Sequence, residues 1–188
     1  IRIVEKKAPS PLITGDSILC VGETTRIMVV DTFNTYRWSN TNTSNSILVN
    51  AAGKYSVTVT DKEGCSISGS IMVDVKSNPS ADIRGVTFFC EGKSTILTAP
   101  NGRFTYRWSV NNATTQDVEI KTPGPVSLTV TNEFGCTASS SLSIIERSNP
   151  AIQVGGDKIF CGNARATLIA DQGFRAYLWS TKDTSRTI

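Results

Sequence analysis

A short string containing tryptophan occurs three times in this chain at a nearly constant step. Tyr-Arg-Trp-Ser occupies residues 36–39 and 106–109, and Tyr-Leu-Trp-Ser occupies residues 177–180, so the steps are 70 and 71 residues. The same steps separate three cysteines (Cys20, Cys90, Cys161) and three prolines (Pro9, Pro79, Pro150). A fixed period that runs through several residue types predicts one small domain copied in tandem.

Aligning the copies gives repeats at 9–78 and 79–149, with a third, truncated repeat at 150–188. Each repeat begins at a proline after a short polar stretch, and such a junction is extended and fairly stiff. Residues 1–8 match the end of the second repeat, so we expect them to be the last strand of a preceding repeat. The chain therefore reads as a window from a longer array.

The pattern within a repeat predicts short β-strands. Residues 54–60 alternate polar and apolar without a break, residues 126–131 are their counterpart, and the turns at 61–64 and 132–135 would close hairpins. The second repeat also predicts strands at 81–89, 95–99, 117–120 and 142–145, and no segment has helical spacing. Six or seven such strands predict a two-sheet antiparallel sandwich, with a small barrel as the alternative.

The recurring aromatic residues are predicted core. Alternation along a strand places the tyrosine and the tryptophan of each string on the same face. Sugar stacking is the other use for an exposed tryptophan, but recurrence at one strand position favours burial. The predicted core residues are Trp38, Trp108, Trp179, Tyr36, Tyr106 and Tyr177.

The cysteines predict a disulfide within each complete repeat. Cys20 and Cys65 are 45 residues apart, and Cys90 and Cys136 are 46 apart, so the expected partner of Cys161 lies outside the chain. A domain of about 70 residues is marginal without such a staple, which would contribute roughly 4 kcal/mol. Buried free thiols are the alternative, and bridges would imply an oxidising, extracellular setting.

Composition argues against several functions. The chain has no histidine, which removes the usual general base and leaves two thiolates per repeat, too few to close a zinc site. Its formal net charge is only +3, without the basic face of a nucleic-acid binder, and it contains no run of about 20 apolar residues. We expect a non-enzymatic protein with no cofactor, no metal, no nucleic-acid partner and no membrane span in this segment.

Four motifs, Cys-x-Gly, Tyr-x-Trp-Ser, Gly-x-Tyr-x-Val-Thr-Val-Thr and Gly-Cys, fall in the first repeat at 20–22, 36–39, 53–60 and 64–65. This motif set resembles the Ig-like or PKD-like repeats of large secreted Bacteroidota cell-surface proteins. The second repeat departs at Pro125 and Val126, and the third changes the first motif to Cys161-Gly162-Asn163. PKD domains often carry Trp-Asp-Phe-Gly-Asp-Gly, which this chain lacks, so no calcium site is carried over.

The resemblance implies a segment of a long bacterial surface adhesin, of the gliding-motility kind exported by the type IX secretion system. Its partners would be neighbouring repeats, a surface or glycan ligand, and the secretion or motility machinery. The alternative is a set of spacer or glycan-binding modules in a secreted polysaccharide-degrading enzyme.

Overall fold

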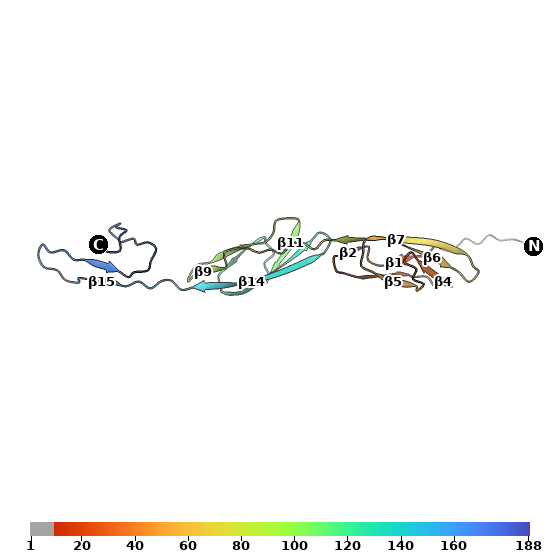
Figure 1. The fold of residues 1–188 in the computed structure, drawn as a ribbon, viewed down its shortest axis with the longest axis horizontal. Helices are drawn as coiled ribbons and strands as arrows, with labels where there is room; N and C mark the ends of the chain where they lie inside the picture. Colours follow the sequence, from red (N-terminus) through yellow and green to blue (C-terminus); the bar gives the residue numbers. More distant parts are fainter. Residues whose placement is uncertain (1–9) are drawn as a thin grey trace, which may run out of the picture. The chain divides into compact units, whose positions relative to one another are not determined.

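The computed structural model describes residues 10–188, and the strand predicted at 1–8 lies outside them. The described chain is all-β, with sixteen strands and no helix (Figure 1). The first seven strands are β1 (Ile13–Thr14), β2 (Ile18–Cys20), β3 (Thr25–Val29), β4 (Thr35–Trp38), β5 (Ser46–Val49), β6 (Gly53–Thr60) and β7 (Ser66–Lys76). The next seven are β8 (Arg84–Gly85), β9 (Phe88–Cys90), β10 (Thr95–Thr98), β11 (Phe104–Trp108), β12 (Asp117–Ile120), β13 (Gly124–Asn132) and β14 (Thr137–Arg147). The last two are β15 (Val154–Gly156) and β16 (Leu168–Ala170).

Strands β1–β7 form a first sandwich and strands β8–β14 form a second one with the same topology. In the first sandwich, a sheet ordered β1-β3-β5 packs against a sheet ordered β2-β7-β6-β4. In the second, the sheets are β8-β10-β12 and β11-β13-β14-β9. The predicted sandwich architecture is therefore the observed one.

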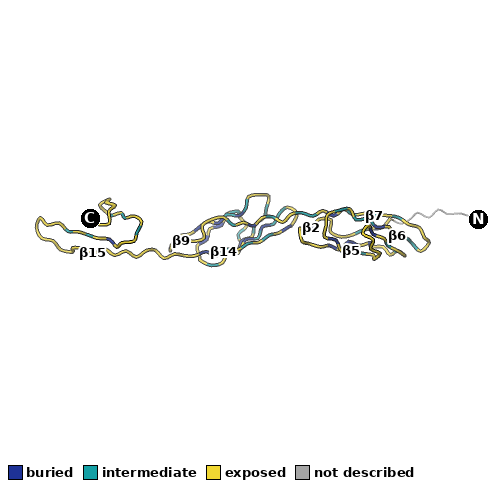
Figure 2. Tube along the Cα trace, in the orientation of Figure 1, coloured by how far each residue is buried: buried dark blue, intermediate teal, exposed yellow. Residues whose placement is uncertain are grey.

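Each sandwich has its own hydrophobic core. Trp38 is only 2% exposed and lies in the first core with Leu19, Ile27, Val57 and Val73. The second core has the same pattern around Trp108, which is fully buried. Figure 2 shows the buried residues gathered in these two sandwiches, whereas the chain around β15 is mostly exposed.

Near the start of each sandwich, the chain crosses from one sheet to the other at a glycine. The single strand predicted at 81–89 is in fact two: β8 pairs with β10 in one sheet, and β9 joins β14 in the other. Gly85, at the end of β8, has φ of +137°, and a Cβ there would lie 2.5 Å from the carbonyl oxygen of Ile96. Gly15 and Gly156 occupy the equivalent positions and are crowded by backbone in the same way. Only a residue without a side chain fits this crossing.

The hairpin strands are longer than the hydrophobic pattern indicates. The final strand of the second repeat is predicted at 142–145, but β14 begins at Thr137. In the first sandwich, β7 likewise begins at Ser66 and pairs with β6 from Thr60↔Ser66 to Gly53↔Val73. Its first half carries serines, which give no apolar signal. Thr58 and Thr60 instead share 2.8 Å hydroxyl hydrogen bonds with Ser68 and Ser66 across the strands. Cross-strand pairs of this kind stabilise an exposed sheet face.

The pairing of β2 with β7 departs from the antiparallel prediction. β2 runs parallel to β7, with Ile18 opposite Asp74 and Cys20 opposite Lys76. Cys20, the last residue of β2, therefore lies beside Lys76, the last residue of β7, where the chain leaves the first sandwich. This register decides where the cysteines lie.

Candidate functional site

The candidate site in the described chain is a disulfide bond with polar contacts around it, at the point where the first sandwich leads into the second. Cys20 is disulfide-bonded to Cys136, with their Cα atoms 5.4 Å apart. The bond joins residues 116 positions apart and links one sandwich to the next. Cys65, Cys90 and Cys161 are free and exposed.

The predicted pairing of the cysteines within each repeat is therefore wrong. Cys20 lies beside Lys76 at the end of β7, whereas Cys65 directly precedes Ser66 at the start of the same strand. At about 3.3 Å per residue, the 11-residue strand holds these two cysteines roughly 35 Å apart, far beyond the 7 Å that a disulfide spans. Cys90 and Cys136 are separated in the same way by β14.

Two tight turns present the bonded cysteines. On the first side, the Cys20 amide donates to the Glu23 carboxylate at 2.9 Å, and the turn between them is closed by a hydrogen bond from Glu23 N to Cys20 O. On the second side, the Asn132 side-chain oxygen accepts from the amides of Phe134 (3.0 Å) and Cys136 (2.9 Å). An Asx side chain that caps a turn in this way is a common turn-forming device. It fixes the direction of Cys136, whose side chain is fully buried.

The linker between the sandwiches is held by side chains from the second hairpin. The Asn132 amide donates to the carbonyl oxygen of Ser77 at 3.0 Å. The Lys76 ammonium lies 4.7 Å from the centre of the Phe134 ring. A cation over an aromatic face contributes about 0.5–1 kcal/mol at an exposed site. The junction is thus fastened by one covalent bond and several weaker contacts.

Lys76 also forms an ion pair with Asp74. The hydrogen bond and the charge of Lys76 hold the pKa of Asp74 below its ordinary value. Since Asp74 is exposed, this pair contributes little to stability. Its effect is to orient Lys76 beside the turn that carries Cys136.

The predicted aromatic core residues are buried to different extents along the chain. Trp38 and Trp108 are buried and donate their indole N–H to the carbonyl oxygens of Ser44 (2.8 Å) and Thr115 (3.0 Å). Tyr36 and Tyr106 pack at the edges of the two cores. Trp179 makes the equivalent bond to Ser185 at 2.7 Å but is only half-buried, as is Tyr177.

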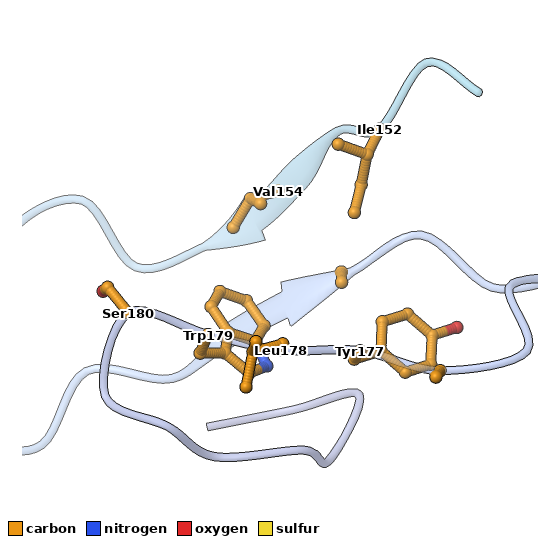
Figure 3. Close-up of a pocket in the computed structure, with 8 residues that line it drawn as sticks. Ile152, Val154, Tyr177, Leu178, Trp179 and Ser180 are labelled. Atoms are coloured by element: carbon orange, nitrogen blue, oxygen red, sulfur yellow. The ribbon is translucent and has the colours of Figure 1, made fainter. Parts of the chain in front are cut away.

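A pocket in residues 150–188 explains why Trp179 is half-buried. Figure 3 shows Ile152 and Val154 on one side of it, facing Trp179 and Tyr177. The full lining is Ile152, Val154, Ala170, Ala176, Tyr177, Leu178, Trp179 and Ser180. The residues 71 positions earlier include Ala81, Ala99 and Trp108, which in the second sandwich are covered by the core that β13 and β14 complete. The described residues after 149 contain no counterparts of those two strands, and the hollow is left open.

Residues 10–188 lack two features, a metal-binding cluster and a membrane-spanning helix. These residues contain no group of three or more histidine, cysteine or acidic side chains that could hold a metal ion. Within the same range there is no helix with the length and apolar character needed to cross a membrane.

The disulfide junction was missed by the sequence reasoning because nothing in one sequence distinguishes a parallel β2 from an antiparallel one.

Comparison with known proteins gives weak structural likenesses. No family model matches the chain, and no curated protein matches it. Among solved structures, a fragment of intimin, in complex with the intimin-binding domain of its translocated receptor, is 15% identical with a TM-score of 0.44 over 80% of this chain and 67% of that one. A calcium-stabilised adhesin with which an Antarctic bacterium binds ice is 13% identical with a TM-score of 0.43 over 79% of this chain and 52% of that one. Murine CEACAM1b is 11% identical with a TM-score of 0.38 over 72% of this chain and all of that one.

Proposed function

We propose that this chain is a non-catalytic segment of a long bacterial cell-surface adhesin, in which tandem Ig-like repeats form a disulfide-linked stalk. The observation that carries this proposal is the bond between Cys20 and Cys136, which joins one sandwich to the next and stabilises their connection. The proposal includes repeats at 9–78, 79–149 and 150–188, an extracellular location, and a Bacteroidota gliding-motility adhesin exported by the type IX secretion system as the parent. An extracellular location fits the bond, since disulfides persist in oxidising compartments.

The mechanism of such a stalk follows from the path of the covalent chain. A force applied at the two ends passes from Cys20 directly to Cys136, so the chain between these two residues bears no load while the bridge is intact. At about 3.5 Å per residue, the chain that the bridge protects from stretching would be roughly 400 Å long when fully extended. A spacer built this way keeps its length under tension.

Single-molecule force spectroscopy tests this mechanism. We expect the oxidised chain, pulled from its ends, to give no length increment from the segment between Cys20 and Cys136. After treatment with a phosphine reductant, the same molecule should release roughly 400 Å in two steps, one for each sandwich. Release of that length with the bridge intact would contradict the proposal.

The adhesive contact itself is a separate part of the proposal. Trp38 and Trp108 are buried, so they cannot serve as stacking platforms for sugars. We therefore propose that ligand binding, where it occurs in these repeats, uses other surfaces or other parts of the parent protein. A glycan array probed with the oxidised chain tests this, and strong binding that is lost on replacing Trp38 or Trp108 without unfolding would contradict it.

A further inference from the structure

The structural surroundings of the Cys20–Cys136 bond are built a second time around a free cysteine. At the first junction, Val21 N donates to Lys76 O (3.0 Å), and the Asn78 side chain donates to Val21 O (3.4 Å). At the end of the second sandwich, Glu91 N donates to Arg147 O (2.8 Å), and the Asn149 side chain donates to Glu91 O (3.2 Å). Cys90 therefore holds the same place beside its exit strand as Cys20 does.

The other half of the junction is also duplicated. In the first sandwich, the Asp61 carboxylate accepts from the amides of Glu63 (3.0 Å) and Cys65 (2.8 Å), as Asn132 does for Phe134 and Cys136. Gly64 and Gly135 follow with the same φ of +86°. Cys65 is thus presented by the same turn as the bonded Cys136, but its thiol is exposed.

We propose that Cys65 and Cys90 are each one half of a disulfide to a neighbouring repeat. Cys90 bonds to the counterpart of Cys136 in the repeat that follows. Cys65 bonds to the counterpart of Cys20 in the repeat that precedes. Cys161 follows the rule of Cys90. Every repeat then carries two bridges, one to each neighbour, and none within itself. This inference rests on the tandem arrangement of the proposed function but not on adhesion.

The chemistry of each bridge is ordinary thiol–disulfide exchange. One thiolate attacks an external disulfide oxidant, such as oxidised glutathione, and expels one glutathione thiolate. The partner thiolate then attacks the mixed disulfide and expels the second. Two protein thiols and one oxidised glutathione give one protein disulfide and two reduced glutathiones.

The rule accounts for all five cysteines with one geometry. The bonded pair follows it, and the residues after 149 contain no counterpart of Cys136 with which Cys90 could pair. The alternative bonds within a sandwich are excluded because each would have to span an 11-residue strand.

The test is a chain of complete repeats. Residues 1–149 are followed directly by a second copy of residues 79–149, marked with Val86→Ile and Thr137→Ser so that its peptides differ in mass. After alkylation and digestion, we expect Cys20 linked to the first Cys136, and the first Cys90 linked to the Cys136 of the added copy. In a matched control with Cys136→Ser in the added copy, the first Cys90 should be alkylated.

Equilibration in a glutathione buffer then measures how strongly the folded junction holds the two thiols together. We expect the effective concentration of the new thiol pair to lie within about tenfold of that of Cys20 and Cys136. A flexible tether supplies only about millimolar effective concentration. A millimolar value, an alkylated Cys90, or a link from Cys90 to the Cys136 of its own repeat would each overturn the inference. None of these results would alter the force measurement on the Cys20–Cys136 segment, so the two proposals fail separately.

Discussion

Opening the Cys20–Cys136 bond is expected to change how the two sandwiches unfold as well as how stable they are. The bond closes a loop of 116 positions, which the junction at Ser77 divides into 57 from Cys20 and 59 to Cys136. On the loop-entropy model, a loop of 57 or 59 residues costs an unfolded chain about 4 kcal/mol, and a loop of 116 costs about 5 kcal/mol. Unfolding either sandwich alone therefore incurs nearly the whole penalty.

The consequence is a coupling between the sandwiches. Two separate penalties of about 4 kcal/mol exceed the shared penalty of about 5 kcal/mol by about 3 kcal/mol. If the two sandwiches differ in intrinsic stability by less than that amount, the bridged chain unfolds both together. Without the bridge, each sandwich unfolds at its own midpoint.

Guanidinium unfolding followed by tryptophan fluorescence measures this effect. The shared 5 kcal/mol is about 2.5 kcal/mol per sandwich, which at a slope of about 2 kcal/mol per molar moves the midpoint by about 1 M. We expect the oxidised chain to give one steep transition, and the reduced chain or the Cys20→Ser, Cys136→Ser variant to give shallower unfolding at lower denaturant. Cys65→Ser is the control, with no expected change. Equal midpoints and slopes with and without the bridge would refute the reasoning.

Three further predictions concern single residues. Gly85→Ala should destabilise the second sandwich in a thermal melt by at least about 2 kcal/mol, because a φ of +137° is strained for alanine and the new Cβ would meet the carbonyl oxygen of Ile96. Gly92→Ala should cost less in the same thermal melt, because a Cβ at that position has no neighbour within 4 Å. Trp108→Ala should cost about 3–5 kcal/mol by chemical denaturation, and Trp179→Ala should cost clearly less because its side chain is half-buried; equal losses would contradict the description of the pocket. Lys76→Met should raise the pKa of Asp74 toward its ordinary value in a carbon-detected NMR titration, since Lys76 lowers it; an unchanged pKa would show that the pair is not formed in solution. With the native Lys76, the small stabilisation from Asp74 is present above the pKa of the unfolded chain and is lost as the pH falls through the lower folded pKa.

Much of the local structure of these sandwiches could be predicted from the sequence. The period-two segment at 54–60 became β6, because a strand with one buried face needs that alternation. Trp38 and Trp108 are buried, as their recurrence at one strand position indicated. The serine-rich half of β7 was missed because its partners are hydroxyl groups rather than apolar side chains.

The covalent links could not be read from spacing. The intervals of 45 and 46 residues are regular, but they recur in any periodic chain and do not show which cysteine faces which. The deciding fact is the parallel pairing of β2 with β7, which places Cys20 at the far end of the strand that Cys65 begins. Parallel and antiparallel edge strands have the same composition, so only the fold reveals the partner.

The bond between the sandwiches has a consequence for how the chain withstands proteolysis. Residues 40–45 form an exposed polar loop and residues 110–116 form a partly exposed one, and loops are the segments that proteases cut first. A single cut at either loop falls between Cys20 and Cys136, so the two ends of the chain remain attached through sulfur. The proposed stalk would therefore survive a single cut in its backbone without losing the part of the chain beyond the cut.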